Sequence, residues 1–390
     1  MNKKHIRIIL TGGGTGGHVF PLVAVAREIK KLAQENHIET SLIYIGPVDY
    51  TTQALTQEGV VLKKIIAGKW RREFSFANIF DLFKTAIGCL QSFFWLFFYM
   101  PEAVFSKGGF GAFPVCLIAT IFHIPLYEHE SDTIPGLVSN LFKKTARKIF
   151  VSFKSALAFF PIAKTYVLGS PIREAFYADY DIKNCRQVVG LKDDKPVVVV
   201  LGGSQGAQFI NTLIVEGLAD LLPECQVVHQ TGPTNLAEVS RMAEVMLQEF
   251  DPDQNLRVDY HPVAFLDEQA VSGFKSLYNV LASADLVVTR AGSGSIAELS
   301  AMGKPMILIP LSSASQNHQW KNASTVANEG AGIILEQGNL KANTLAQTIV
   351  NLLHNSERLA SLSSKSKALG LSHKQAAQNI AEMMLQDIFR

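Results

Sequence analysis

The sequence predicts an α/β protein made of two doubly wound, Rossmann-like domains that face each other across a cleft. Short β-rich runs alternate with helical patterns, which is typical of βαβ units and a parallel sheet. The alternation starts again after residues 169–171, and each half has a glycine-rich turn between a strand and a helix. A chain of 390 residues also has the length expected of two domains.

In the first half, short apolar runs are predicted as strands. They are Ile6–Leu10, Ser41–Ile45, Ala103–Phe105, Pro125–Tyr127, Lys148–Val151 and Tyr166–Leu168. A helix is predicted between the first two, because apolar residues recur at positions 22, 25, 26, 29 and 32. This half is expected to form a domain over residues 1–172.

The second half repeats the pattern after a polar stretch from Arg173 to Lys195. Its predicted strands are Val197–Leu201, Gln226–His229, Leu286–Thr289, Met306–Pro310 and Gly332–Leu335. We expect a domain over residues 173–360 and a helical tail over 361–390. Ligands of such sheets bind beyond the carboxyl ends of the strands, so the site residues are expected in the loops that follow them.

The composition is that of a globular protein. Hydrophobic residues make up 48% and charged residues 18% of the chain, enough apolar material for two packed cores. The 36 basic and 34 acidic residues give a net charge of +2, so no nucleic-acid partner is expected. The four cysteines are far apart and are predicted to be free thiols in a reducing compartment. A glycine-rich turn interrupts the first apolar run before a signal sequence could form, which favours a cytoplasmic protein.

The first glycine-rich turn, residues 10–18, follows a strand and opens a helix. Its GxGxxG pattern is a weak signal for a dinucleotide site, and it lacks the GK[ST] of a P-loop. The glycines let the backbone approach a ligand, and the helix N-terminus favours an anion. His18 is not part of the dinucleotide pattern and can titrate near neutral pH. A structural turn, with His18 as a capping or packing residue, is the alternative.

Two further loops carry groups suited to a sugar nucleotide. Residues 200–207 repeat the strand, glycines and helix of the first turn, and Ser204 could donate to a phosphate oxygen. Residues 289–299 place small side chains before a helix, where the Glu298 carboxylate could accept both hydroxyls of a ribose. Residues 316–323 are rich in amides. The alternatives are a second structural turn, a glutamate favoured by the helix dipole, and a polar loop.

The chain also contains two matches to DxD, a metal–nucleotide motif of some glycosyltransferases. They are Asp179-Tyr180-Asp181 and Asp251-Pro252-Asp253. Neither follows a clear strand, so both are interpreted as solvated loops. No metal ligand and no cofactor is predicted.

A set of motifs occurs in one order between about Ile6 and Gly330. They are Gly13-Gly14-Thr15-Gly16-Gly17-His18 with Pro21, Gly108-Gly109-Phe110, His129-Glu130-Ser131-Asp132 with Pro135-Gly136-Leu137, Gly202-Gly203-Ser204-Gln205-Gly206 with Asn211, Arg290-Ala291-Gly292, Glu298, and Gln319 with Asn322-Ala323. This set closely resembles the MurG family, bacterial transferases that move N-acetylglucosamine from UDP-GlcNAc to lipid I (undecaprenyl-pyrophosphoryl-MurNAc-pentapeptide) to give lipid II in peptidoglycan synthesis. Many members have Asn in place of Asp132 and Tyr in place of Phe110, and the segment 261–274 is longer than usual.

The resemblance implies a GT-B fold with the UDP-sugar mainly on the C-terminal domain. The residues implied to bind substrate are Thr15, Gly16, Gly17, Asp132, Arg173, Ser204, Ser293, Gly294, Ser295, Ile296, Ala297, Glu298, Gln319 and Asn322. Glu298 would take the ribose, while Arg173 and the two helix N-termini would stabilise the diphosphate.

The chemistry implied by the resemblance is displacement at the anomeric carbon with inversion, which requires a base for the acceptor hydroxyl. His18 is the first candidate for this base, and His129 and Glu130 are its rivals.

The motifs leave other functions open. A related GT-B transferase acting on another lipid, or a UDP-sugar epimerase, would share these motifs. A non-catalytic sugar-nucleotide-binding subunit is disfavoured because both half-sites occur in one chain. A nicotinamide-dependent oxidoreductase rests on GxGxxG alone and needs an acidic residue about 20 positions on; Glu35 and Glu39 have no clear strand end before them.

An apolar segment, Phe74 to Met100, is predicted to form a helix or a helical pair. Phe80, Phe83, Ile87, Leu90, Phe94 and Phe98 fall along one side, and half of this stripe is expected to face the sheet. Phe93, Trp95, Leu96 and Phe97 add apolar surface on the other sides, and Lys63, Lys64, Lys69, Arg71 and Arg72 precede it. The segment is short and interrupted for a membrane span. We therefore expect peripheral binding to the anionic cytoplasmic face of the cell membrane.

Overall fold

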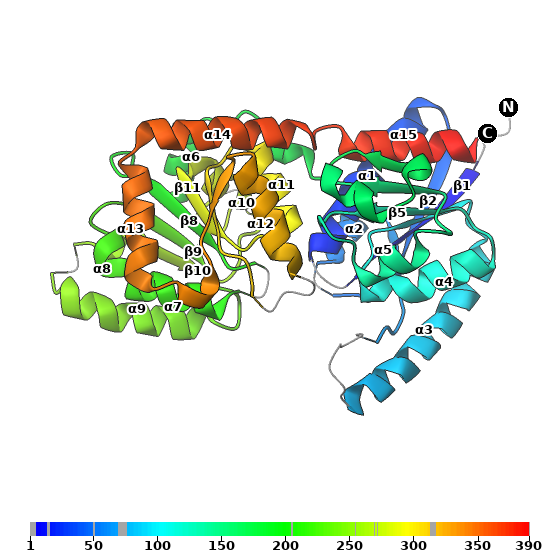
Figure 1. Cartoon of the computed structure of the whole chain (residues 1–390), viewed down its shortest axis with the longest axis horizontal. Coiled ribbons are helices and arrows are strands. Elements are labelled where there is room, and N and C mark those ends of the chain that lie inside the picture. Colours follow the sequence, from blue (N-terminus) through cyan, green and yellow to red (C-terminus); the bar gives the residue numbers. More distant parts are fainter. Residues whose placement is uncertain are drawn as a thin grey trace. The chain divides into compact units, whose positions relative to one another are not determined.

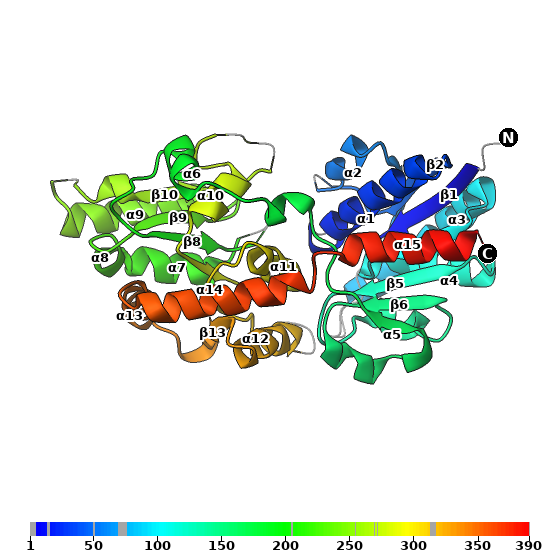
Figure 2. The ribbon, with the colours of Figure 1, turned by 90° about the horizontal axis from the view of Figure 1, so that it is seen from above.

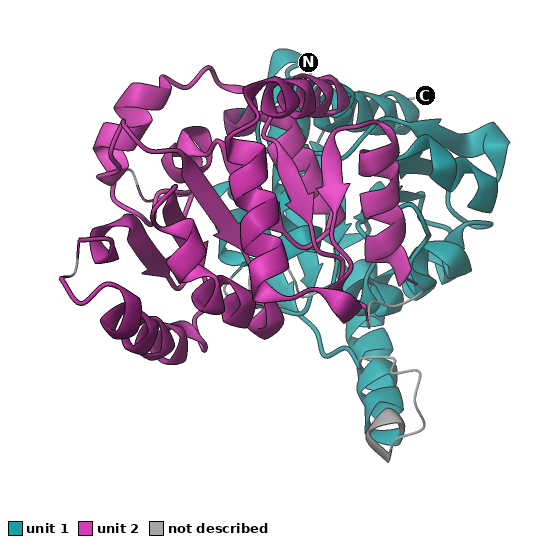
Figure 3. Ribbon diagram, turned by 60° about the vertical axis from the view of Figure 1, so that its left-hand side comes forward, with its two compact units in different colours: residues 1–174, 372–390 teal, residues 175–371 magenta. Residues whose placement is uncertain are grey.

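The computed structural model describes residues 5–13, 16–49, 51–68, 76–203, 206–253, 255–268, 270, 272–312 and 317–389, without the side chains of 76–78. Thr15 and Ser204, both predicted to bind substrate, lie outside the described residues. The chain divides into two compact units (Figure 3). Unit 1 contains Met1–Glu174 and Ser372–Arg390, and unit 2 contains Ala175–Leu371. Each has a parallel sheet covered by helices (Figure 1), which confirms the predicted pair of α/β domains.

The sheet of unit 1 has the order β3-β2-β1-β4-β5-β6-β7. Its strands are β1 (His5–Thr11), β2 (Glu39–Gly46), β3 (Val61–Lys64), β4 (Ala103–Ser106), β5 (Leu126–Glu130), β6 (Lys148–Val151) and β7 (Thr165–Val167). All neighbouring strands pair in parallel. The three central strands β1, β4 and β5 therefore end side by side at one edge of the sheet. The first candidate loops follow from these ends.

The helices of unit 1 connect these strands. They are α1 (Gly16–Glu35), α2 (Gln53–Gln57), α3 (Phe76–Tyr99), α4 (Phe113–Ile121) and α5 (Leu137–Phe142). The buried face of α1 contributes Leu22, Val25 and Ile29 to the core on one side of the sheet. Because α1 begins within the last residues of the first glycine-rich turn, its packing holds the end of that turn near the carboxyl end of β1.

The C-terminal helix α15 (Ala376–Ile388) belongs to unit 1, although the sequence suggested a separate tail over 361–390. It lies along α1 (Figure 2), and Ile380 and Met384 are fully buried there. Asp387 also connects α15 to the sheet. Its Oδ2 accepts a hydrogen bond from the Tyr127 hydroxyl at 3.2 Å and pairs with the Lys148 ammonium group at 2.9 Å. The preceding helix α14 (Ser356–Leu371) remains in unit 2.

The sheet of unit 2 has the order β10-β9-β8-β11-β12-β13. Its strands are β8 (Val197–Leu201), β9 (Gln226–Gln230), β10 (Tyr260–Val263), β11 (Leu286–Thr289), β12 (Met306–Leu308) and β13 (Gly332–Ile334), all parallel to their neighbours. Its helices before α14 are α6 (Ile182–Val189), α7 (Gln208–Glu216), α8 (Leu218–Leu221), α9 (Leu236–Phe250), α10 (Leu277–Ser283), α11 (Ser293–Ala301), α12 (His318–Asn328) and α13 (Ala342–Leu353). The order is doubly wound, so β8 and β11 end together beside the second and third candidate loops.

Candidate active site

In unit 1, the first glycine-rich turn packs directly against the loop that follows β4. A Cβ atom on Gly13 would lie 3.1 Å from the Gly109 Cα, and one on Gly109 would lie 3.0 Å from His18 Nε2. Gly109 also has a φ of 79°, a conformation that side chains disfavour. Glycine at both positions therefore lets the two turns meet around the imidazole of His18.

His18 lies half-buried in the first turn of α1, beside Gly16 and Gly17. Burial first, and then the positive charge of Lys107, lower the pKa of His18 to about 4. The negative charge of Asp132 acts in the opposite direction. The ring is thus neutral at pH 7 and has a nitrogen lone pair able to take a proton.

The two rival bases lie at the end of β5, where both are already engaged in the fold. His129 is fully buried, and its Nε2 lies 2.9 Å from the carbonyl oxygen of Gly169, to which a neutral ring would donate. Glu130 accepts the backbone N–H of Asp132 at 3.0 Å with Oε1 and that of Gly136 at 2.8 Å with Oε2. Burial lowers the pKa of His129 and raises the pKa of Glu130. Glu130 is thus engaged with the segment 131–136 and His129 with Gly169, so neither side chain is presented as a base.

Arg173 lies at the end of unit 1 and is only 3% exposed. Its guanidinium carbon lies 4.3 Å from the ring centroid of Phe20, on α1. This cation–π contact places the predicted diphosphate-binding cation beside the helix that carries His18.

In unit 2, the second glycine-rich turn joins β8 to α7, as predicted. A Cβ on Gly206 would lie 2.1 Å from the carbonyl oxygen of Thr231, so only glycine fits there. Gln230 donates to the carbonyl of Gly203 at 2.9 Å and accepts from the Leu266 N–H at 3.1 Å. Sequence reasoning missed Gln230, which ties the turn to the segment after β10.

The third constellation lies where β11 leads into α11. A Cβ on Gly292 or Gly294 would meet no described atom within 4 Å, so a ligand has room to approach this helix N-terminus. Ser293 and Ser295 are half-buried there, and so is Glu298 farther along the helix. Ile296 and Ala297, also predicted to bind substrate, are 0% and 1% exposed and pack inward. They can offer a ligand only their backbone groups.

Gln319 and Asn322 of α12, both predicted to bind substrate, form hydrogen bonds to the loops around α11. Asn322 is fully buried and donates to the carbonyl of Ala291 at 3.2 Å. Gln319 accepts from the N–H of Leu311 at 3.0 Å through its oxygen. Gln319 is half-buried. Within the described part of the chain its NH₂ group makes no hydrogen bond, so this group is available to a ligand.

The two DxD matches have local structural roles. Asp181 caps α6 by accepting the backbone N–H groups of Lys183 and Asn184. Asp251 accepts three successive backbone N–H groups, from residues 255, 256 and 257, at 2.7–3.0 Å. Both aspartates therefore stabilise turns.

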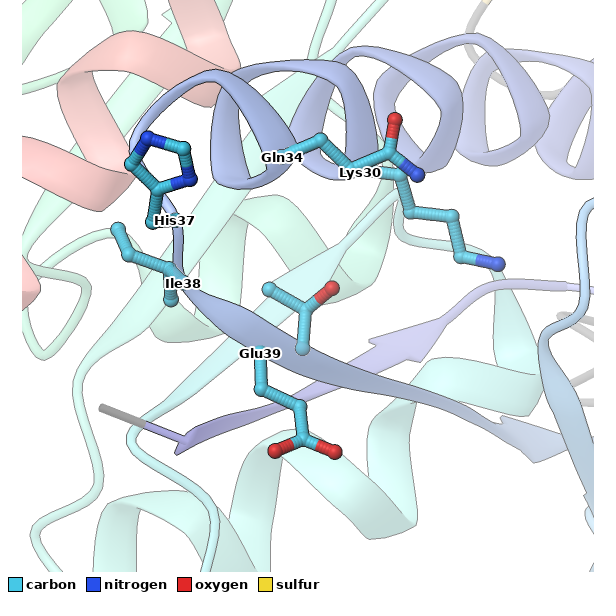
Figure 4. A pocket seen from close by; sticks show the side chains of 6 residues that line it. Lys30, Gln34, His37, Ile38 and Glu39 are labelled. Atoms are coloured by element: carbon cyan, nitrogen blue, oxygen red, sulfur yellow. The ribbon is translucent and has the colours of Figure 1, made fainter. Parts of the chain in front are cut away.

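A surface hollow of about 470 Å³ also occurs in unit 1 (Figure 4). It is lined by Lys30, Gln34, His37, Ile38, Glu39 and Thr40. These residues lie at the end of α1 and the start of β2, at the amino edge of the sheet. The hollow is thus at the opposite edge from the turns that carry His18 and Glu130.

The fold and these turns define a class of protein. Residues 8–151 match the glycosyltransferase family 28 N-terminal domain, and residues 197–383 match the family 28 C-terminal domain. Among solved structures, MurG of Acinetobacter baumannii is 20% identical with a TM-score of 0.70, covering 98% of this chain and 99% of that one. The UDP-GlcNAc 2-epimerase of Neisseria meningitidis, bound to UDP-GlcNAc, is 14% identical with a TM-score of 0.67, covering 98% and 100%. These likenesses show the fold, which is GT-B.

Curated relatives define the family more closely. A protein of Treponema denticola is 33% identical over 380 residues, 93% of each chain, and one of Bacillus cytotoxicus is 31% identical over 383 residues, 98% and 99% of the two chains. Both have the name UDP-N-acetylglucosamine–N-acetylmuramyl-(pentapeptide) pyrophosphoryl-undecaprenol N-acetylglucosamine transferase. The chain belongs to this family, the MurG family of glycosyltransferases.

Proposed function

We propose that this chain transfers N-acetylglucosamine from UDP-GlcNAc to lipid I and so makes lipid II for peptidoglycan synthesis. The observation that carries the proposal is full-length identity of 31–33% to transferases named for this reaction. The acceptor hydroxyl oxygen attacks the anomeric carbon, and the bond from that carbon to the diphosphate breaks with inversion. UDP leaves with the electron pair, and the acceptor proton passes to a base.

His18 is the base that the geometry of unit 1 supports best. Its ring is neutral at pH 7 because burial lowers its pKa to about 4. His129 and Glu130 are held by hydrogen bonds to backbone groups. A pKa of about 4 makes His18 a weak base, and an anionic group bound beside its ring would raise that pKa toward the working pH.

The donor site is proposed on unit 2, at the N-termini of α7 and α11. Open space beside Gly292 and Gly294 admits a phosphate group to the positive end of α11. Glu298 then takes the ribose hydroxyls, and the NH₂ group of Gln319 supplies a donor for the sugar. Ser204 and Thr15 keep the phosphate and sugar roles that the family resemblance gives them.

Selectivity for the N-acetyl group is the first expected result. UDP-GlcNAc should raise the melting temperature more than UDP-glucose, because amide donors around Gln319 have an additional partner in the N-acetyl group. A thermal-shift titration with both sugars, and with UDP alone as the control, measures this difference. Equal shifts for the two UDP-sugars would show that the site does not recognise the N-acetyl group.

A UDP-sugar epimerase is the second candidate, because the solved Neisseria meningitidis 2-epimerase shares the fold. Incubation of the purified chain with UDP-GlcNAc, with and without lipid I, separates the two reactions. A transferase releases UDP only when the acceptor is present. An isomerised UDP-sugar formed from the donor alone would favour the epimerase.

The membrane contact is proposed on α3, which projects from the body of unit 1 (Figures 1 and 3). The predicted stripe does not face the sheet, because its members are exposed by 46% or more. These are Phe80, Phe83, Ile87, Leu90, Phe94 and Phe98. Leu96 instead is fully buried and faces the core beside α4. The expectation that half of the stripe is covered by the sheet is therefore wrong, and the apolar surface is larger than predicted.

The charge and length of this region favour binding at a lipid surface. Lys63 lies with its Nζ 4.7 Å from the Trp95 ring centroid, beside the exposed Lys64. Residues 69, 71 and 72 lie outside the described residues. Ile79–Tyr99 is long and apolar enough to cross a membrane, and 17% of its most apolar stretch is buried. Buried Leu96 packs α3 against α4 in unit 1. This contact favours a helix that lies on the membrane surface over one that crosses the membrane.

Removal of this surface should release the protein from vesicles. Replacing Phe94, Phe97 and Phe98 with serine should lower binding to anionic vesicles at least tenfold, since burying each phenyl ring contributes roughly 1.5–3 kcal/mol. Co-sedimentation at low and high salt measures the change, and binding of UDP-GlcNAc should persist.

A matched control replaces three exposed aliphatic residues of unit 2, Ile182, Val245 and Val258, with serine. This variant should bind vesicles as the unchanged protein does. Equal vesicle binding by the α3 variant would contradict the proposal, and extraction only by detergent would indicate a spanning helix.

A further inference from the structure

His229 is a fully buried histidine of unit 2 that the proposed reaction does not use. It lies on β9, opposite Val200 in the register of the sheet and so close to the end of β8, where the second glycine-rich turn begins. Its Nδ1 lies 2.9 Å from the hydroxyl oxygen of Tyr260 on β10, and its Nε2 lies 3.1 Å from Oδ1 of Asn211 on α7. The ring therefore joins its own strand to a neighbouring strand and to a covering helix.

The partners of His229 decide which ring nitrogen carries the proton. The carbonyl of Thr231 can only accept, and Nδ2 of Asn211 donates to it at 3.0 Å. The amide oxygen of Asn211 therefore faces the ring, and Nε2 of the ring donates to it. Nδ1 then has a lone pair, which accepts from the Tyr260 hydroxyl. Burial lowers the pKa of His229 to about 3, so this neutral form persists at pH 7.

Asn211 extends this network to the start of α7. It lies in the first turn of the helix, and its backbone N–H donates to the carbonyl of Ala207 at 2.9 Å. Its side chain holds the carbonyl of Thr231, against which Gly206 packs so closely that a Cβ would collide with it. Asn235 donates to the same oxygen at 3.0 Å. One buried network thus holds the end of β9, the last glycine of the turn and the first turn of α7.

We propose that His229 is a positioning residue for the donor, because it holds the N-terminus of α7, through Asn211, in the position that binds the diphosphate. This role rests on the proposed donor site of unit 2, to which it adds a residue that contacts neither substrate. Without a donor for its oxygen, the amide of Asn211 can rotate and release Thr231. The start of α7 then occupies the binding position for only a fraction of the time, and the apparent donor affinity falls by that fraction.

The test is UDP-GlcNAc binding to His229→Leu, measured by isothermal titration. Leucine fills the buried site but cannot donate, so the Kd should rise about tenfold or more, the order of one hydrogen bond lost at a buried group. The kcat at saturating donor should fall much less, as expected for a loss of binding alone. His229→Gln has an amide that can donate toward Asn211 and should restore the Kd to within about threefold. A histidine that serves only folding would lower the melting temperature and leave this Kd unchanged, which would overturn the proposal.

Gln226→Leu is the matched control on the same strand. Gln226 lies at the amino end of β9, is 1% exposed, and forms hydrogen bonds with backbone groups of Lys192 and Lys195. Its replacement also leaves buried polar groups without partners, so the melting temperature should fall. The Kd for UDP-GlcNAc should not change. An equal rise of the Kd in this control and in His229→Leu would contradict a specific role for His229.

A double-mutant cycle tests whether His229 acts through Asn211. Asn211→Leu should weaken donor binding at least as much as His229→Leu does. The double variant should bind no more weakly than Asn211→Leu alone, because the second substitution removes a hydrogen bond that is already lost. Effects that add would show that His229 acts by another route and would overturn the proposal.

Tyr260→Phe provides a milder variant should His229→Leu fail to fold. It removes only the hydroxyl group that donates to Nδ1. The Kd for UDP-GlcNAc should rise roughly 2- to 10-fold, the ordinary contribution of one hydrogen bond. An unchanged Kd would contradict the proposal.

These binding measurements need neither lipid I nor turnover, so they separate this proposal from the proposed transfer. A protein that binds UDP-GlcNAc but transfers no sugar would overturn the proposed function and leave the effect of His229 measurable. An unchanged protein that binds neither UDP nor UDP-GlcNAc would overturn the donor site and the role of His229 together. Nitrogen NMR of the ring should show a proton on Nε2 and a lone pair on Nδ1, and the opposite tautomer would refute the network.

Discussion

His18→Ala should lower turnover by roughly 10²–10⁴-fold, the usual cost of removing a general base. Donor affinity should change little, because most of the proposed donor contacts lie on unit 2, at the N-termini of α7 and α11. Single-turnover transfer at saturating UDP-GlcNAc, with the donor Kd measured separately, checks both parts of this prediction. The kcat/KM of the unchanged protein should also fall as the pH drops, because protonated His18 has no lone pair to accept a proton.

The same assay on His129→Ala and Glu130→Gln compares the rivals. Since both side chains bind backbone groups, their substitution should lower stability or raise KM for lipid I more than it lowers kcat. Near-normal turnover in His18→Ala, with a loss of 10²-fold or more in one of the others, would move the role of the base to that residue.

Glu298→Ala should weaken UDP-GlcNAc binding more than it slows chemistry. Ribose hydroxyls that lose a charged acceptor cost roughly 1.5–3 kcal/mol, about 10- to 150-fold in Kd. Isothermal titration with UDP-GlcNAc measures the change, and kcat at saturating donor should fall much less. The half-buried position of Glu298 on α11, beside open space at Gly292 and Gly294, motivates the prediction.

Glu238→Ala provides the matched control, because Glu238 is an exposed acidic residue in the first turn of α9. Glu238 lies where the helix dipole favours a carboxylate and has no proposed ribose contact, whereas Glu298 lies beyond the first turn of α11. Its substitution should leave Kd unchanged. An unchanged Kd in Glu298→Ala as well would mean that Glu298 only stabilises its helix.

Much of the fold could be predicted because buried parallel strands are continuous apolar runs. The runs Lys148–Val151, Val197–Leu201 and Leu286–Thr289 match the observed β6, β8 and β11 in both bounds. Each glycine-rich turn also lies between a strand and a helix, as predicted. The sequence pattern is strong here because both faces of each strand are covered.

The elements that were missed lie at the edges of the sheets. β3 and β10 are the outermost strands, and each has only four residues. Val61 in β3 is 49% exposed, and Pro262 interrupts the donors of β10. β10 overlaps the segment 261–274, in which no strand is predicted. Partly exposed edge strands need little apolar sequence, so no periodicity marks them.

The site could be predicted as a set of loops but not as a set of contacts. Sequence order does not show that Glu130 uses both oxygens on its own segment, or that Asn322 binds Ala291 across the loop.

Transfer of labelled sugar is the most direct test of the central claim, that this one chain joins the donor sugar to the lipid-linked acceptor. The purified protein is incubated with UDP-GlcNAc radiolabelled in the sugar and with synthetic lipid I in vesicles. We predict that label enters the lipid fraction, one sugar for each UDP released, with inverted anomeric configuration. Label that stays water-soluble while UDP or an isomerised UDP-sugar accumulates would contradict the account.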